Sequence, residues 1–104
     1  MEEEKMLKIE KRQDGTKYTL ALTGRLDANG ASQLEKEVFE IIADTEELEF
    51  DLEKTEYISS AGLRVLLATH KVMSKRGKVS VTHVSEDVME IFKMTGFVDI
   101  LDIK

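Results

Sequence analysis

Two adjacent serines, Ser59 and Ser60, are the residues of this sequence best placed for chemistry. They follow an apolar segment at 48–52 that is typical of a buried strand, and they precede a helical pattern that includes Leu63. The sequence therefore places them where a strand leads into a helix, so that free backbone N–H groups and the positive end of the helix dipole point outward. A hydroxyl at such a position is exposed and accessible to a reagent or to a partner protein.

Nucleophilic catalysis is the first use of Ser60 to consider, and the sequence argues against it. Ser60 and Gly62 match the second half of the Gly-x-Ser-x-Gly motif, but Ile58 occupies the first glycine position. The two histidines are His70, about 15 Å further along the same predicted helix, and His83, on a predicted strand. Neither is placed to serve as the base that a serine nucleophile needs.

A metal or cofactor site also lacks support in the sequence. The chain has no cysteine, and its two histidines are separated without a His-x-x-x-His spacing. We expect His70 to be partly buried on its helix and His83 to be exposed on its strand. No Gly-x-Gly-x-x-Gly or Walker pattern indicates a phosphate-binding loop, so the sequence predicts neither a metal nor a cofactor.

Phosphorylation within a protein interface is the remaining use of Ser60. A phosphoryl group adds about −1.5 to −2 charges and three acceptor oxygens. A helix N-terminus accommodates this charge, whereas a packed interface does not. One hydroxyl could therefore end an interaction without unfolding the domain. The competing interpretation is that Ser59 or Ser60 only caps the helix, and the residue chemistry alone favours capping.

Length and composition set limits on the function. The 104 residues suffice for one domain, for which we expect residues 6–104, with residues 1–5 as a flexible N-terminus. A net charge of −6 argues against a sequence-independent nucleic-acid binder, which needs a basic face. No apolar run approaches the ~20 residues that span a bilayer, and no signal-peptide pattern is present. We therefore expect a cytoplasmic protein without membrane insertion.

Hydrophobic periodicity predicts the elements that position the serines. Strands at 6–11 and 18–23, joined by a turn at Asp14-Gly15, form an antiparallel hairpin. After residue 24, helices alternate with strands, which favours right-handed crossovers and parallel pairing. The expected fold is α/β, with a mixed and mainly parallel sheet, the N-terminal hairpin at its edge and helices mainly on one face. The three helices begin after Asp27 or Asn29, near Leu63 and at Ser85, and Gly96 ends the third helix. The remaining strands span 48–52, 78–84 and 97–101.

Four segments, taken in order over about residues 6–102, resemble the STAS domain of anti-sigma factor antagonists, also called anti-anti-sigma factors. They are the Gly-x-Leu-Asp stretch at 23–27, the core strand at 48–52, the phosphorylation loop at 57–63 and the helix end at 92–97. This resemblance implies a STAS-like single domain. It also raises the switchable interface above simple capping as the interpretation of Ser60.

The resemblance also implies which residues act. Ser60 falls on the family's phosphorylated serine, and Ser59, on the usual Asp, is the alternative acceptor. Two positions differ from the family pattern: the acidic residue before the phosphoserine is missing, and Arg25 is a cation where some relatives carry an acid. The implied partner-binding residues are Asp27, Ser59, Ala61, Gly62, Leu63 and Arg64.

The function implied by the resemblance is partner switching in transcription regulation. The unmodified domain would bind an anti-sigma factor that is a serine kinase, and the sigma factor would be released. The kinase would phosphorylate Ser60 with ATP, and a PP2C-like phosphatase would reverse the modification. The domain itself would not be an enzyme. Two alternatives stay open: a STAS subunit of another signalling or lipid-transport complex, and an enzyme of unknown type.

Overall fold

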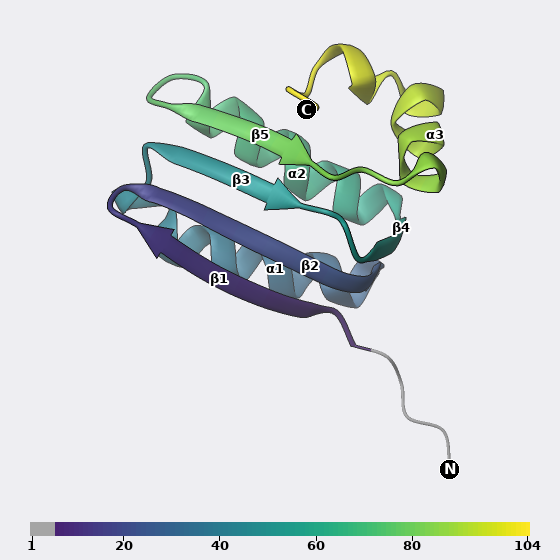
Figure 1. Ribbon diagram of the computed structural model, residues 1–104, viewed down its shortest axis with the longest axis horizontal. Coiled ribbons are helices and arrows are strands. Elements are labelled where there is room, and N and C mark those ends of the chain that lie inside the picture. The colour runs from purple at the N-terminus through teal and green to yellow at the C-terminus, as the bar shows by residue number, and fades with distance from the viewer. Residues whose placement is uncertain (1–5) are drawn as a thin grey trace.

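The computed structural model describes residues 6–104, so the prediction for residues 1–5 lies outside its described part. A five-stranded sheet forms one layer, and helices α1 and α2 form a second layer against one of its faces (Figure 1). In chain order the elements are β1 (Lys8–Asp14), β2 (Lys17–Leu26), α1 (Ala28–Ile41), η1 (Ile42–Asp44), β3 (Glu47–Asp51), β4 (Thr55–Ile58), α2 (Ser60–Met73), β5 (Lys78–Thr82), α3 (Glu86–Thr95) and η2 (Phe97–Asp99).

Strand β2 organises the sheet because it pairs along both of its edges. It pairs antiparallel with β1 on one edge, and parallel with β3 and then β4 on the other. β5 extends the sheet by parallel pairing with β3. The hairpin register sets Asp14 opposite Lys17, and Gly15 in the turn adopts a φ of 65°, which glycine reaches without strain. The mixed sheet with an N-terminal antiparallel hairpin is thus confirmed.

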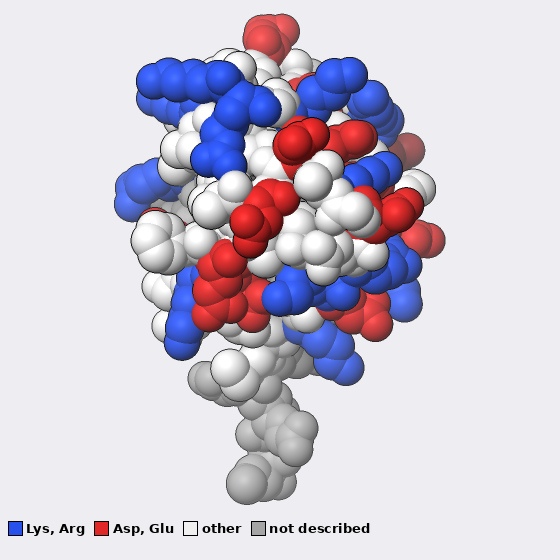
Figure 2. Space-filling model, turned by 90° about the vertical axis from the view of Figure 1, so that its left-hand side faces the viewer, with Lys and Arg blue, Asp and Glu red and all other residues white. Residues whose placement is uncertain are grey.

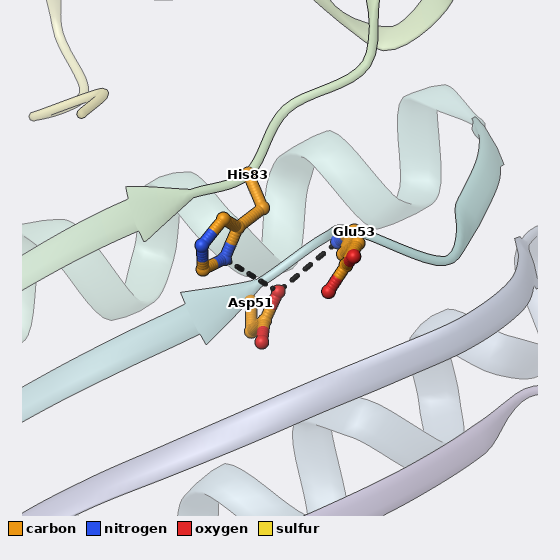
Figure 3. Close-up of side chains that lie close together, drawn as sticks. All are labelled: Asp51, Glu53 and His83. Atoms are coloured by element: carbon orange, nitrogen blue, oxygen red, sulfur yellow. Dashed lines mark hydrogen bonds and ion pairs between the residues drawn. The ribbon is translucent and has the colours of Figure 1, made fainter.

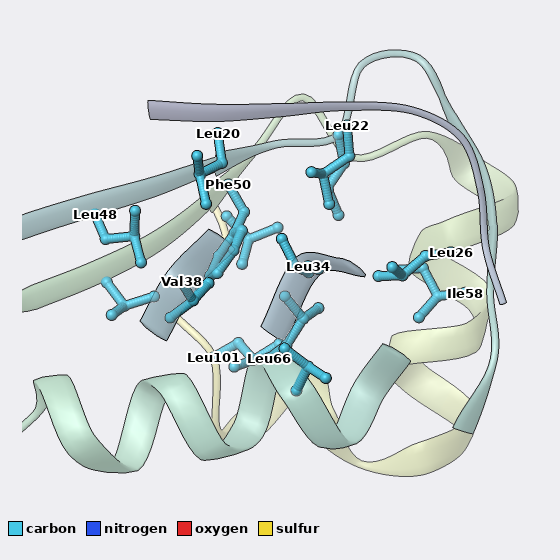
Figure 4. Packing of buried hydrophobic residues seen from close by; sticks show 14 of the residues in the cluster. Leu20, Leu22, Leu26, Leu34, Val38, Leu48, Phe50, Ile58, Leu66 and Leu101 are labelled. Carbon is cyan, nitrogen blue, oxygen red and sulfur yellow. The ribbon is translucent and has the colours of Figure 1, made fainter. Parts of the chain in front are cut away.

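The core lies between the sheet and the two long helices. Alternate residues of β2 point toward the helices, and Leu20 and Leu22 are fully buried there. They form one apolar cluster with Leu34 of α1 and Leu66 of α2 (Figure 4). The intervening residues of β2 face the uncovered side and are mostly partly exposed. The prediction that the helices lie mainly on one face of the sheet is thus confirmed.

Helix α3 lies at the end of the sheet near β4 (Figure 1). The buried side chains of Val88 and Phe92 anchor it there. Both of its predicted ends are confirmed. The Ser85 side chain accepts a hydrogen bond from the Val88 N–H, and Gly96 ends the helix with a φ of 81°. Within residues 6–104, no helix has both the length and the apolar character needed to cross a membrane.

The strand predicted at 97–101 is wrong. The chain forms the short 3₁₀ helix η2 there, with the backbone N–H groups of Ile100 and Leu101 both donating to the Phe97 carbonyl. A single bridge between Ile103 and Val81 is the extended pairing that follows. A short apolar run does not by itself distinguish a strand from a turn of helix, and the sharp turn at Gly96 decides the outcome.

The sequence did not predict β4, the short strand directly before the two serines. Its four residues are buried only at Thr55 and Ile58, so they show neither an alternating pattern nor an apolar run. Pairing with the second half of β2 makes this segment a strand, with a register shift at Gly24, where φ is 108°. β4 thus connects the central strand of the sheet to the start of α2.

Candidate functional site

The candidate site lies at the edge where β2 and β4 end side by side. Leu26 and Ile58 are paired across these parallel strands, and the next residue of each chain segment caps a helix. Asp27 Oδ1 accepts the Gly30 N–H at 2.9 Å at the start of α1. Ser59 Oγ accepts the Gly62 N–H at 3.2 Å at the start of α2. Two helix N-termini are therefore neighbours on one surface.

The adjacent serines have different surroundings. Ser59 is partly buried, its hydroxyl accepts the capping hydrogen bond, and its N–H donates to the Leu26 carbonyl at 2.9 Å. Ser60 is the first residue of α2 and is exposed. Within residues 6–104 the Ser60 hydroxyl makes no hydrogen bond. Ser59 therefore supplies the cap, and the Ser60 hydroxyl is left exposed to solvent.

The rest of the first turn of α2 divides into inward and outward residues. Gly62 is buried, and a Cβ on it would lie 2.7 Å from Cγ of Leu26. Leu63 is 6% exposed and belongs to the core, whereas Ala61 is partly buried. Arg64 is exposed. Ser60 and Arg64 are thus the outward-facing side chains of this turn, and Gly62 and Leu63 fix its position from within.

A stacked cation lies on the strands that lead into this edge. The guanidinium of Arg25 lies over the Tyr57 ring, 4.5 Å from its centroid, where β2 and β4 pair these two residues. Tyr57 is 37% exposed, and Arg25 is exposed. The contact holds a positive charge on the surface beside Asp27. The sequence identified Arg25 as unusual but gave no sign of its partner, because the strand that carries Tyr57 was not predicted.

The two histidines have the predicted burial and do not serve Ser60, but the strand predicted at 78–84 ends at Thr82, so His83 lies beyond it. His70 is partly buried on α2, ten residues beyond Ser60, which corresponds to about 15 Å of helix. His83 is exposed directly after β5, and its Nδ1 lies 3.0 Å from Oδ1 of Asp51 on the uncovered side of the sheet. The catalytic arrangement that the sequence argued against is therefore not assembled among residues 6–104.

A small cluster of polar side chains on the uncovered side of the sheet was not anticipated (Figure 3). It consists of Asp51, Glu53 and His83, whose side-chain ligand atoms lie within 4.8 Å of one another. Such groups can bind a divalent cation, but Nη2 of Arg12 lies 3.8 Å from the Asp51 carboxylate and already offsets its charge. The pairing of β3 with β5 brings the cluster together, which local sequence patterns do not reveal.

The charges of the molecule are mixed in sign on the end that carries the β1–β2 turn. Figure 2 shows acidic and basic side chains side by side over this face. A nucleic-acid-binding surface gathers lysine and arginine to contact successive phosphates. This face does not have that character, in agreement with the net charge of −6.

Comparison with known proteins relates the chain to a family. The family model described as "Mlab, STAS domain" matches residues 9–102. The anti-sigma-B factor antagonist of Bacillus subtilis is 26% identical over 98 residues, which cover 93% of this chain and 90% of the relative. A putative anti-sigma factor antagonist, BtrV, of Bordetella bronchiseptica is 33% identical over 84 residues, covering 79% of this chain and 72% of the relative.

Solved structures show the same fold. An anti-sigma factor antagonist from Mycobacterium paratuberculosis superposes with a TM-score of 0.85 at 21% identity, covering 93% of this chain and 84% of that chain. The anti-sigma factor antagonist SpoIIAA in its unphosphorylated form gives a TM-score of 0.79 at 16% identity, covering 94% and 87%. The Bacillus SpoIIAA has also been solved phosphorylated, with a TM-score of 0.72 at 15% identity and coverage of 94% and 90%. These likenesses confirm the predicted STAS fold.

Proposed function

The chain belongs to the STAS domain family of anti-sigma factor antagonists, and on that premise we propose that it is a phosphorylation-switched protein-binding module. In unmodified form it binds an anti-sigma factor that is also a serine kinase, and the sigma factor is thereby released. The kinase transfers the γ-phosphoryl group of ATP to the Ser60 hydroxyl and then dissociates. A PP2C-like phosphatase then restores the free hydroxyl. The cycle takes place in the cytoplasm, and the domain itself supplies no catalytic group.

One observation carries this proposal: the exposed Ser60 hydroxyl begins a helix whose cap is already provided by Ser59. A hydroxyl needed for capping would be unavailable to a kinase, and its modification would weaken the helix. Here the two roles belong to two different residues. Phosphorylation of Ser60 therefore leaves the hydrogen bond between Ser59 and Gly62 in place.

The position of Ser60 also explains how the domain tolerates the modification. The phosphate would lie at the N-terminus of α2, where the helix dipole favours negative charge. Arg64 is exposed four residues further along the helix, the spacing at which side chains on one face interact. An unfavourable free energy of about 3 kcal/mol in the protein interface would weaken binding over a hundredfold. Phosphorylation of Ser60 therefore weakens partner binding more than it changes the stability of the domain.

The proposed partner surface consists of the two neighbouring helix starts. Ser60 and Arg64 of α2 face outward there, and Asp27 is partly exposed at the start of α1. Gly62 and Leu63 are buried and contribute to partner binding indirectly, because they fix the position of the turn that carries Ser60 and Arg64. The names of the relatives support an anti-sigma factor as the partner class, and the phosphorylated form of SpoIIAA supports a modification of this kind.

The proposal is tested by capture in the presence and absence of ATP. The immobilised wild-type chain and its Ser59→Ala and Ser60→Ala variants would be incubated with extract of the source organism, then treated with Mg-ATP. Trypsin cleavage after Lys54 and Arg64 yields one peptide, 55–64, that contains both serines for mass spectrometry.

Wild type and Ser59→Ala should release a captured kinase on ATP addition and gain phosphate on Ser60, whereas Ser60→Ala should retain the kinase. Phosphate on the Ser60→Ala variant would assign the switch to Ser59 instead. A captured partner that lacks kinase activity and is unaffected by ATP would contradict partner switching and support a subunit of another signalling or transport complex.

A further inference from the structure

An apolar groove runs between α1 and α2 on the side that faces away from the sheet. Its volume is about 280 Å³, and its apolar walls are formed by Val38, Phe39 and Ile42 of α1 and by Val65, Ala68 and Val72 of α2. Phe39 is 81% exposed and Val72 47% exposed. A large aromatic side chain gains much of its stabilising free energy from burial, so a solvent-exposed one beside an apolar groove indicates a docking surface.

The two helices that form the groove carry charges of opposite sign, although Glu35 is the charged residue that lines the groove itself. α1 carries Glu35, Glu37 and Glu40 against a single Lys36. α2 carries Arg64 and Lys71 and no acidic residue. The groove therefore presents an acidic helix beside a basic helix. A second copy of the same surface offers the complementary charges if it is turned so that α1 meets α2.

The fold allows that arrangement. Both helices start directly after the paired ends of β2 and β4, so they run side by side in the same direction from the same level. Phe39 and Lys71 each lie eleven residues beyond the first residue of their helix. A two-fold axis that runs along the groove, parallel to both helices, places α1 of one copy over α2 of the other. Phe39 of one copy then lies at the same height along the axis as Lys71 of the other.

We propose that the chain forms a reversible homodimer through this groove. Phe39 of each copy packs between Ala68 and Val72 of the other, and Glu40 approaches Lys71 across the two-fold axis. The interface is isologous, so each favourable contact occurs twice. This surface contains neither Ser59 nor Ser60, and the dimer does not depend on the proposed switch.

The size of the groove predicts a weak dimer. Two side chains, Phe39 and Val72, supply most of the exposed apolar surface, so the interface falls at the small end of specific protein contacts, below about 1,200 Å². We expect a dissociation constant between about 1 µM and about 1 mM. The wild-type chain should therefore change from a monomer of 11.8 kDa to a dimer as its concentration is raised across that range.

Analytical ultracentrifugation of the full chain across this concentration range tests the proposal. Phe39→Glu should weaken dimerisation at least about tenfold. Met94→Glu is the matched control and should dimerise as wild type does, since Met94 is 83% exposed on α3 and does not line the groove. Circular dichroism of both variants verifies that each remains folded.

A charge-reversal pair keeps the test independent of Phe39. Lys71→Glu should weaken the dimer by like-charge repulsion, and adding Glu40→Lys to the same chain should restore it, because each copy then offers the exchanged charges. A chain that stays monomeric up to about 1 mM would overturn the proposal. So would equal weakening by Phe39→Glu and Met94→Glu, or a failure of Glu40→Lys to restore association.

Discussion

Leu26, at the end of β2, packs directly against Gly62 in the first turn of α2. A Cβ on Gly62 would lie 2.7 Å from Cγ of Leu26 and 3.0 Å from the Leu26 carbonyl oxygen. The same carbonyl accepts the N–H of Ser59 at 2.9 Å. Because Leu26 is completely buried and contacts both Ser59 and Gly62, strand β2 fixes the position at which α2 begins. The exposure of Ser60 thus depends on a close contact in which it takes no part.

Gly62→Ala should lower the free energy of unfolding by about 1–3 kcal/mol, because the new methyl group overpacks this contact. The effect opposes the gain of about 1 kcal/mol that alanine normally gives over glycine within a helix. Urea unfolding followed by circular dichroism measures the difference. Ser60→Ala, an exposed change in the same turn, is the control and should alter stability by less than about 0.5 kcal/mol. A Gly62→Ala variant more stable than wild type would contradict the inferred contact.

Ser59→Ala should destabilise the chain by about 1 kcal/mol, because it leaves the Gly62 N–H without its cap. Ser60→Ala should leave stability almost unchanged, since the Ser60 hydroxyl has no bonding partner within residues 6–104. Thermal unfolding of the two variants side by side measures the contrast. Equal losses of stability would mean that both hydroxyls are structural and would remove the division of roles between them.

Local chemistry accounts for what the sequence predicted correctly. The alternation in β2 and the 3.6-residue spacing in α1 are properties of single segments. The cap at Ser85, the stop at Gly96 and the choice of Asp27 or Asn29 as the cap of α1, which the structure resolves to Asp27, depend on residues within three positions of one another. All of these features were readable without knowledge of the tertiary structure.

Non-local pairing accounts for what was missed. The segment Thr55–Ile58, whose two middle residues are exposed, becomes strand β4 only because β2 continues past β3 and offers it a free edge. Without β4, the sequence could place Ser60 at the start of a helix but could not place Asp27 beside Ser59. The contacts of Arg25 with Tyr57 and of Asp51 with His83 were also missed, because each joins residues that are far apart in the sequence and are brought together by strand pairing.

The stacking of Arg25 on Tyr57 should be measurable in a double-mutant cycle. Arg25→Ala and Tyr57→Ala should each cost stability, and the interaction free energy from the cycle should be about 0.5–1 kcal/mol, as expected for an exposed cation–π contact. Chemical unfolding of the four chains provides the values. Strictly additive effects would show that the two side chains lie together without interacting.

A negative charge should affect α2 differently at its two ends. Ser60→Asp places the charge at the N-terminus and should leave stability unchanged or raise it by up to about 1 kcal/mol. Ser74→Asp places it at the C-cap, where the helix dipole opposes it, and should lower stability by a similar amount. Raising the salt concentration should reduce both effects. Two variants of equal stability would show that the helix dipole contributes nothing at these positions.

The same pair of substitutions tests the interface. Ser60→Asp should weaken binding to the kinase partner identified by capture over a hundredfold, since a carboxylate would replace a neutral hydroxyl at the centre of the proposed contact. Ser74→Asp adds the same charge at the far end of α2 and should leave affinity unchanged to within a few-fold. Isothermal titration calorimetry of wild type and both variants gives the three dissociation constants. If the Ser60→Asp chain bound as tightly as wild type, Ser60 would lie outside the interface and its charge could not control release.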